Sequence, residues 1–144
     1  CAQFAFGTYI ATVCEAEVDE SGQVRIRRVH SVIDAGRIVN PDTLMAQVQG
    51  GLTFGFTAAL YGEITVKDGR VQQRNFNDYR MMRINEAPPI EVHIVPSHEM
   101  PGGIGEPGCT AGPPSLVNAI AAATGIRLRK LPIDRDILAG KKIA

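Results

Sequence analysis

Residues 34–61, DAGRIVNPDTLMAQVQGGLTFGFTAALY, carry the clearest structural signal in this 144-residue chain. Within this stretch, Asn40 and Pro41 form a typical helix start, because an Asn side chain accepts hydrogen bonds from free N–H groups and Pro suits the first helical position. The apolar residues that follow recur at helical spacing and include Leu44, Val48, Leu52 and Ala59. We therefore expect a helix over about 41–61 with one face in the core.

Two runs before this helix predict the strands of a long antiparallel hairpin. Residues 4–18, FAFGTYIATVCEAEV, are rich in aromatic, β-branched and small residues, as in a largely buried strand. Residues 19–22, DESG, are typical of a turn, and residues 24–33 have the composition of a returning strand.

After the helix, the chain predicts short strands, a long loop and a second helix. Asp68 and Gly69 are a turn signal for a second hairpin. Residues 90–95, IEVHIV, alternate as a short strand. Residues 96–114 contain five prolines and five glycines, which indicates an irregular loop. A final helix is expected over 113–124, with Gly125 just after its end.

Length and element order predict one domain over residues 1–144, because a chain of this size is typical of a single domain. Hairpins interspersed with helices, without a βαβ rhythm, indicate an α+β fold of antiparallel hairpins with two main helices. The chain opens inside a strand and without Met. We therefore expect it to be a piece of a longer protein.

Composition excludes several classes of function. Fifteen Lys and Arg balance fifteen Asp and Glu, whereas a general nucleic-acid binder needs a basic surplus. No apolar run reaches the roughly 18 residues of a membrane span. The three cysteines, Cys1, Cys14 and Cys109, include no C-x-x-C pair. Any iron–sulfur cluster would therefore lie on another chain or segment.

Gln47, Gly51 and Gly55 follow one another at four-residue intervals and form a nearly bare stripe on the predicted helix. Because a glycine costs a helix interior about 1 kcal/mol, two on one face indicate that something approaches closely. Tight packing on a sheet or a second helix is one explanation. A ligand lying on this face beside the Gln47 amide is the other.

The stretch PGGIGEPG, residues 101–108, encloses the carboxylate of Glu106 with four glycines and two prolines. Glycine lets backbone approach a ligand and proline restricts the loop, so this stretch can hold a general base in place. An ordinary exposed glutamate is an equal alternative on composition alone. The stretch also matches G-x-G-x-x-G, but Pro107 interrupts the match, no strand leads directly into it, and the helix is expected only from Pro113.

The remaining histidines and cysteines predict no further site. His93 and His98 are five residues apart with Pro96 between them, and His30 is far away in the chain, so the spacing does not suit a shared metal ion. Cys109 lacks an evident base partner, and no G-x-S-x-G nucleophile motif occurs. We expect packed or solvated side chains at these positions.

Three stretches of the chain resemble the molybdenum-binding large subunit of the xanthine dehydrogenase/aldehyde oxidase family. They are residues 34–64, the run VHIVPSHEMPGGIGEPG over 92–108, and SLVNAIAAATGIRLRKLPI over 115–133. The resemblance covers nearly the whole chain and is nearest to the isoquinoline 1-oxidoreductase β-subunit group, which includes bacterial aldehyde dehydrogenases. It implies that the chain is a C-terminal segment of the molybdopterin-binding domain of a larger subunit.

The resemblance also implies roles for individual residues. Glu106 takes the place of the family's catalytic glutamate, a general base beside the molybdenum that activates the water-derived oxygen. Gln47 matches a glutamine that hydrogen-bonds the pterin, and Gly105 matches a backbone position close to the same cofactor. No residue of this chain is expected to ligate the metal.

The protein so implied is a molybdenum-dependent oxidoreductase that oxidises an N-heterocycle or an aldehyde. Its cofactor would be molybdenum–molybdopterin in the cytosine dinucleotide form, with [2Fe–2S] clusters on a small partner subunit. The remainder of the large subunit would be a further partner, and the isolated segment would be inactive. Residues 109–112, CTAG, depart from the more apolar stretch expected after the Gly-Glu-Pro loop.

Two other functions are compatible with the sequence. A non-catalytic assembly or docking domain of the large subunit would keep the hairpins and helices but would need no acid in the loop. A small nucleotide-binding module using the glycine-rich loop is the weaker alternative. Replacement of Glu106 tests the first, and NAD or ATP binding tests the second.

Overall fold

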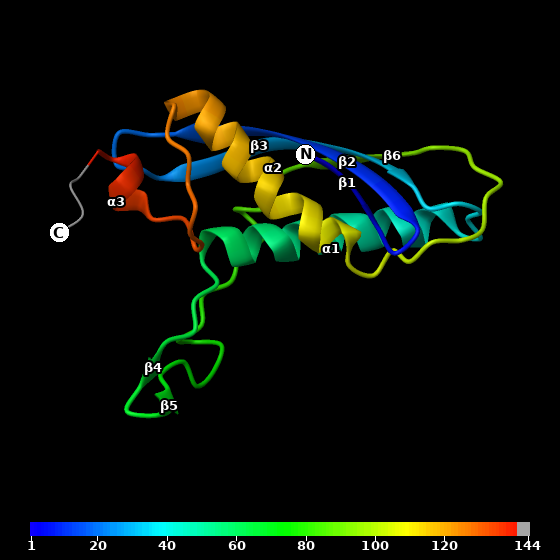
Figure 1. The fold of residues 1–144 in the computed structure, drawn as a ribbon. Coiled ribbons are helices and arrows are strands. Elements are labelled where there is room, and N and C mark those ends of the chain that lie inside the picture. Colours follow the sequence, from blue (N-terminus) through cyan, green and yellow to red (C-terminus); the bar gives the residue numbers. More distant parts are fainter. Residues whose placement is uncertain (141–144) are drawn as a thin grey trace.

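The computed structural model describes residues 1–140, which form a mixed four-stranded sheet, a small two-stranded sheet and three helices. The larger sheet has the order β1-β2-β3-β6, and α1 and α2 cover one face of it (Figure 1). The elements in chain order are β1 (Ala2–Ala5), β2 (Thr8–Val18), β3 (Val24–Asp34), α1 (Pro41–Leu60), β4 (Val66–Lys67), β5 (Arg70–Val71), β6 (Ile90–Ile94), α2 (Pro107–Thr124) and α3 (Arg135–Leu138). The predicted hairpins and two main helices are confirmed.

None of the described helices combines the length and apolar character needed to cross a membrane.

The N-terminal hairpin contains one more strand than expected. β2 and β3 pair antiparallel, from Tyr9 opposite Asp34 to Val18 opposite Val24. The run over 4–18 is divided by a tight turn at Phe6–Gly7, where Gly7 has a φ of 77° that glycine adopts without strain. β1 therefore folds back antiparallel on β2.

The expectation that no βαβ connection occurs is wrong. β6 pairs parallel to β3, from Val29 opposite Ile90 to Ile33 opposite Ile94, and α1 lies between these strands in the chain. Parallel neighbours need such a crossover, because the chain must return to the starting end of the sheet. The long segment 61–89 separates α1 from β6, so the sequence does not show the regular spacing of a strand–helix–strand unit.

The second main helix begins earlier than its sequence predicts. α2 starts at Pro107, not at Pro113, and ends before Gly125, which has a φ of 76°. Both Pro113 and Pro114 lie inside the helix. Because interior proline normally breaks a helix, this pair is a misleading start signal. The loop is therefore shorter, spanning 95–106, and residues 109–112 are helical.

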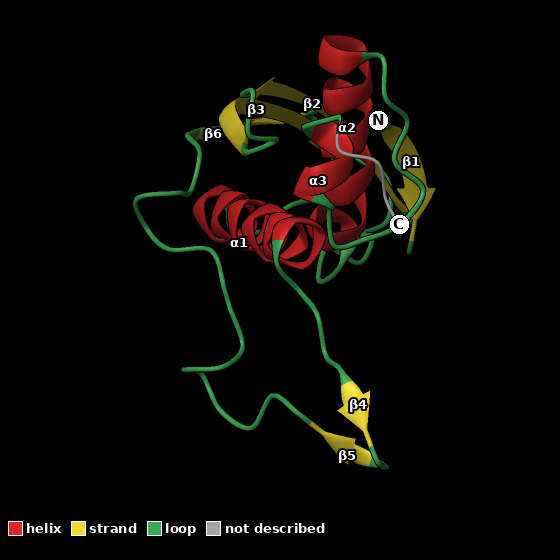
Figure 2. Ribbon diagram, turned by 90° about the vertical axis from the view of Figure 1, so that its left-hand side faces the viewer, coloured by secondary structure: helices red, strands yellow, loops and turns green. Residues whose placement is uncertain are grey.

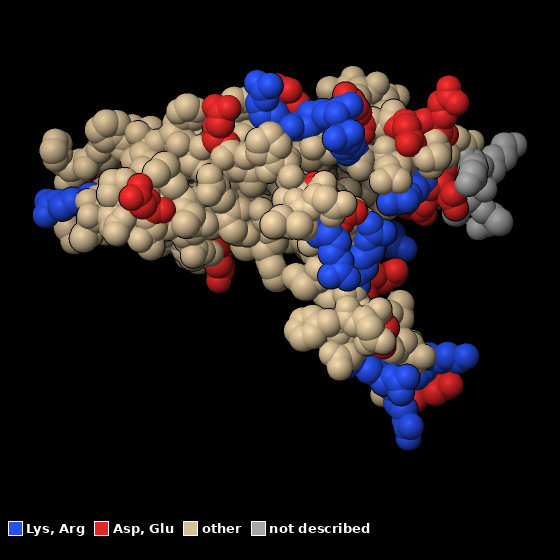
Figure 3. Space-filling model, turned by 180° about the vertical axis from the view of Figure 1, so that it is seen from behind, with Lys and Arg blue, Asp and Glu red and all other residues tan. Residues whose placement is uncertain are grey.

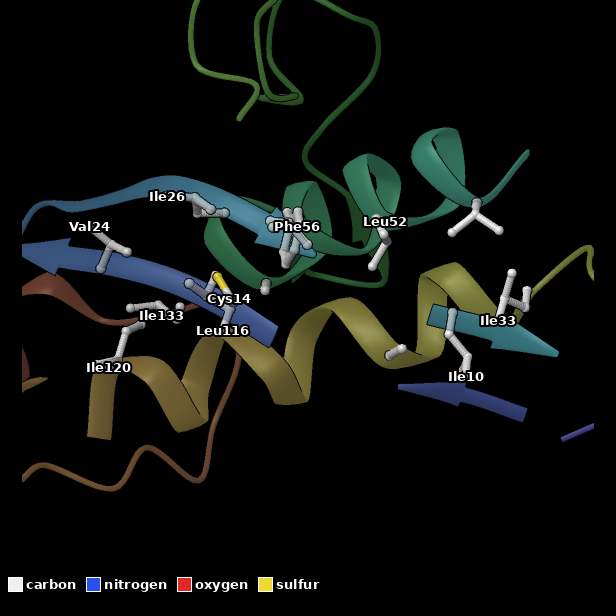
Figure 4. Close-up of a cluster of buried hydrophobic side chains, with 14 of the residues drawn as sticks. Ile10, Cys14, Val24, Ile26, Ile33, Leu52, Phe56, Leu116, Ile120 and Ile133 are labelled. Atoms are coloured by element: carbon white, nitrogen blue, oxygen red, sulfur yellow. The ribbon is translucent and has the colours of Figure 1, made fainter. Parts of the chain in front are cut away.

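The core lies between the sheet and the two main helices (Figure 4). Alternate residues of β2 and β3, including Ile10, Cys14 and Ile33, are buried on the face that the helices cover. Phe56 of α1 and Leu116 of α2 are fully buried above them. The predicted core face of α1 is confirmed, since all of its members are buried: Leu44, Val48, Leu52 and Ala59.

Residues 62–88 form an arm that projects from this body (Figure 2). At its tip β4 and β5 form the predicted second hairpin, which turns at Asp68–Gly69. Glu86 fixes its base, since its carboxylate accepts a hydrogen bond from the Tyr61 hydroxyl at 2.9 Å and pairs with Arg80 at 2.7 Å. In Figure 3, Lys and Arg gather on and beside the arm, whereas the opposite end of the body has few charged side chains.

Candidate functional site

The three predicted site residues lie together where α1 and α2 meet the loop 95–106. Gln47 of α1 donates a hydrogen bond from its Nε2 to the backbone oxygen of Gly105 at 3.0 Å. Glu106 follows directly and is the N-cap residue of α2. One hydrogen bond thus joins residues that are 58 positions apart in the chain.

Hydrogen bonds to two strand ends fix the loop in front of α2. The Gly102 N–H donates to the Ala35 oxygen at 2.9 Å, and the Gly103 N–H donates to the Phe6 oxygen at 2.8 Å. Thr8, which is fully buried, donates its hydroxyl to the Gly103 oxygen at 2.9 Å. The position of the loop therefore depends on both the β1–β2 turn and the end of β3.

Two glycines are needed for this close approach. A Cβ on Gly102 would collide with Thr8 Oγ1 and with the backbone of Gly7. Gly36, which has a φ of 71°, lies directly against the Met100 carbonyl. Part of the glycine content of this region thus serves packing between the loop and the strands.

The glycine stripe on α1 is a helix-packing surface, which corrects the alternative that a ligand lies on Gly51 and Gly55. A Cβ on Gly55 would lie 2.7 Å from the Cys109 oxygen, and one on Gly51 would lie 3.2 Å from Gly108 Cα. Both glycines are buried. α2 therefore occupies the bare face, while Gln47, one turn nearer the N-terminus of α1, lies beyond this contact and is exposed.

The same packing argues against a nucleotide-binding module. Gly108, the last glycine of the G-x-G-x-x-G match, lies inside α2 and is buried, and a Cβ there would lie 2.9 Å from the Val48 oxygen. The preceding strand, β6, ends at Ile94, far ahead of the motif. A dinucleotide loop needs a strand that leads directly into its glycines, so this match lacks the required structure.

Three groups at the site face away from the described protein. Glu106 is exposed, and its carboxylate forms no hydrogen bond or ion pair with residues 1–140. The amide oxygen of Gln47 accepts no hydrogen bond from them either. A Cβ at Gly105 would have no neighbour within 4 Å. The site is an open surface on which Gln47 contacts the Gly105 backbone and the exposed Glu106 is the next residue in the chain.

Cys109 lies in the first turn of α2 and is only partly exposed. Partial burial and, to a lesser degree, the negative charge of Glu106 raise the pKa of its thiol above the ordinary value. Because the thiolate is the nucleophilic form, these surroundings disfavour a reactive role for Cys109.

The structure brings together three further residues that chain spacing separates. His30 Nδ1 lies 3.4 Å from Glu91 Oε2, and His93 Nε2 lies 4.0 Å from the same oxygen. Spacing alone compares His93 with His98 and so misses this cluster. Only the parallel register of β3 and β6, which sets His30 opposite Glu91, would have predicted it.

Comparisons with known proteins assign the fold to a known family. The family model of the molybdopterin cofactor-binding domain matches residues 2–88, more than half of the chain. The structure of the aldehyde oxidoreductase from Desulfovibrio desulfuricans ATCC 27774 is similar, with a TM-score of 0.80 and 26% identity over 92% of this chain and 15% of that one. The fold is that of a domain from molybdenum-dependent oxidoreductases. The chain belongs to the molybdopterin cofactor-binding domain family.

Two relatives illustrate the range of this family. The chain is 35% identical to the isoquinoline 1-oxidoreductase β-subunit of Brevundimonas diminuta, over 93% of this chain and 17% of that protein. It is 36% identical to a protein of Gluconacetobacter polyoxogenes named membrane-bound aldehyde dehydrogenase [pyrroloquinoline-quinone], over 92% of this chain and 18% of that protein. The chain thus spans less than a fifth of the length of these relatives. The resemblance inferred from the sequence is confirmed.

Proposed function

We propose that this chain forms one wall of the cofactor site in a molybdenum hydroxylase and works as one segment of a larger subunit. The main support is Glu106, an exposed carboxylate without a protein partner, held at a fixed point beside Gln47 and Gly105. The names of the two relatives support an aldehyde or an N-heterocycle as the substrate class.

The groups on this wall fit a pterin cofactor. Gln47 would offer its amide oxygen to a pterin N–H, while its Nε2 remains on the Gly105 oxygen. The open space at Gly105 would let the cofactor approach the backbone. When bound, the molybdenum cofactor supplies the acceptor for the two electrons that the substrate loses.

Glu106 acts as the general base of the reaction. Conversion of a substrate C–H bond to C–OH with water releases two protons and two electrons. The carboxylate of Glu106 takes one of these protons. Pro107 and the hydrogen bond from Gln47 to Gly105 restrict the backbone on either side of it, so the backbone that carries the base is held in place before substrate binds. A positioned base contributes about 10²–10⁴-fold to the rate.

The remainder of the large subunit encloses this wall. Three aromatic side chains near the loop, Phe4, Phe6 and Tyr9, are 59–60% exposed. Phe4 and Tyr9 contact each other, with ring centroids 4.5 Å apart. Exposed apolar clusters of this kind mark interaction surfaces, and we place the remainder of the subunit on them.

The cofactor nucleotide and the electron acceptor belong to the same proposal. The cytosine dinucleotide form follows from the resemblance to the bacterial isoquinoline group. We place the [2Fe–2S] clusters on a small partner subunit, because Cys1, Cys14 and Cys109 form no ligand cluster within the described part of the chain. Nucleotide analysis and iron content of the purified complex test both points.

Replacement of Glu106 by Gln in the complete enzyme tests the base. The amide keeps the size of the side chain but cannot take the proton. We therefore expect turnover of aldehydes and N-heterocycles to fall by about 10²-fold or more, with molybdenum content unchanged. Glu99→Gln is the matched control, because Glu99 is an exposed glutamate in the same loop, and it should alter neither quantity.

Molybdenum content and turnover together separate this function from a docking role. Normal turnover of Glu106→Gln at full molybdenum content would exclude the general-base role, and the assembly or docking role would remain. Loss of molybdenum in this variant would assign Glu106 to cofactor retention. A native full-length protein that contains pyrroloquinoline quinone and no molybdenum would refute the hydroxylase proposal outright.

A further inference from the structure

The outer face of the sheet, opposite the helices, contains a cluster of two imidazoles and a carboxylate. β3 and β6 pair in parallel with His30 opposite Glu91 and Val32 opposite His93. Residues two apart on a strand share a face, so Glu91 and His93 both point outward beside His30. Their ligand atoms lie within 4.8 Å of one another.

The distances in this cluster suit a shared cation. Glu91 Oε2 is 3.4 Å from His30 Nδ1 and 4.0 Å from His93 Nε2. A tetrahedral Zn²⁺ with bonds of about 2.0–2.2 Å holds its ligand atoms about 3.3–3.6 Å apart. The Glu91–His30 distance already lies in this range, whereas the other two distances, 4.0 Å and at most 4.8 Å, would have to shorten through side-chain rotation.

We propose that His30, Glu91 and His93 form a three-ligand site for a divalent transition metal, with Zn²⁺ as the ion that fits it. Two imidazole nitrogens and one carboxylate oxygen are a ligand set that zinc takes in proteins, with a fourth position left to water. Hard cations such as Mg²⁺ prefer oxygen ligands alone, so the two histidines select against them.

The backbone around this cluster is already ordered without the ion. The Val29 N–H donates to the Pro89 oxygen at 3.1 Å, and the Val95 N–H donates to the Ile33 oxygen at 2.9 Å, so hydrogen bonds hold both ends of the β3–β6 pairing. The two imidazole rings are nearly parallel, at 10°, with centroids 6.4 Å apart. Metal binding would therefore require little additional ordering of the backbone.

The site is also accessible from solvent. β6 is the edge strand of the sheet, and the side chains of Glu91 and His93 are 58% and 60% exposed. A hydrated ion can therefore reach the three ligands on the described surface. This inference rests on the sheet alone and is independent of the role proposed for Glu106.

Zinc uptake by the intact subunit tests the proposal. The chelator-treated protein is dialysed against micromolar ZnCl₂, and bound zinc is measured by mass spectrometry. We expect one zinc ion per copy of this segment above any constant background. His93→Ala and Glu91→Gln should each weaken that uptake by about tenfold or more, because each removes one of three metal bonds. His98→Ala is the matched control, an exposed histidine outside the cluster, and should bind zinc as the wild type does.

Cobalt provides a second readout, which reports the coordination geometry of the bound ion. Co²⁺ in the wild-type protein should show the intense visible bands of a four-coordinate site, and these bands should be absent from His93→Ala. Uptake that is equal in wild type, His93→Ala and Glu91→Gln would overturn the proposal. So would an absence of zinc binding to the intact subunit, which would show that the remainder of the protein covers this face.

Discussion

At the scale of single residues, the glycines of this domain differ in what a side chain would meet. Gly51, Gly55 and Gly108 face protein atoms at contact distance, which explains why glycine suits the α1–α2 interface. Gly105 faces open space instead, next to the exposed Gln47 and Glu106. A methyl group at Gly105 therefore tests whether a cofactor occupies the space next to this residue.

We expect Gly105→Ala to reduce the molybdenum content of the intact enzyme while the cofactor-free protein keeps its Tm. The added methyl group meets no atom of residues 1–140, but it projects into the space proposed for the cofactor. Mass spectrometry gives the molybdenum content, and thermal unfolding of the cofactor-free protein gives the Tm. Full molybdenum content in the variant would contradict the placement of the cofactor at Gly105.

At the scale of elements, α1 and α2 pack so closely that they position the site as a pair. Gln47 extends from one helix and Glu106 precedes the other, and the tight contact between the helices lies one turn away. Protein interiors tolerate little added volume. A side chain inserted at this contact would therefore separate the helices.

Gly55→Ala should destabilise the domain by about 1–3 kcal/mol, the usual cost of overpacking, because its methyl group would lie 2.7 Å from the Cys109 oxygen. Gly50→Ala is the matched control in the same helix, since a Cβ there meets nothing within 4 Å. That change should stabilise the helix by about 0.5–1 kcal/mol. The apparent Tm of the intact subunit should therefore shift in opposite directions, and equal shifts would contradict the packing described.

The elements that the sequence predicts well are those with local signals. Asn40 caps α1 as expected, and its Oδ1 accepts a hydrogen bond from the Thr43 N–H at 3.1 Å. The start of α2 is missed because Pro113 and Pro114 imitate a helix start, while Pro107, the true first residue, lies within the glycine-rich loop. Local propensity is overridden there by packing against α1.

The site could be predicted as residues but not as an arrangement. Motif resemblance gives Glu106, Gln47 and Gly105 as candidate site residues. Their contact, however, depends on how α2 lies on α1, which no periodicity reveals. The cluster of His30, Glu91 and His93 is hidden for a related reason, because it exists only through the parallel register of two strands that are distant in the chain.

At the scale of the whole molecule, a single layer of buried side chains joins the sheet to both helices, and Cys14 lies within it. Burial and, secondarily, the negative charge of Glu15 raise the pKa of Cys14 from 9.0 to about 12. In the unfolded chain the thiol ionises near pH 9, whereas in the folded chain it stays protonated. Its contribution to stability is therefore complete below pH 9 and is lost as the pH rises toward 12.

Cys14→Ala should accordingly flatten the alkaline part of the stability curve. Between pH 9 and 10 the wild type should lose up to about 1.4 kcal/mol more than the variant, the free energy of one pH unit for one proton. Other titrating groups are common to both proteins and cancel in the difference. Thermal unfolding at pH 8 and pH 10.5 checks this, and parallel losses of Tm would contradict it.

The crossover from β3 through α1 to β6 has a consequence for the order in which the protein matures. Pairing of β6 with β3 closes the long segment 35–89, and such non-local contacts form late in folding. The loop before α2 starts from β6 and is tied to Ala35 and Phe6, so it can be placed only after that closure. On the function proposed above, the cofactor would meet either an incomplete wall or a finished one during biosynthesis, so its loading would depend on completed folding.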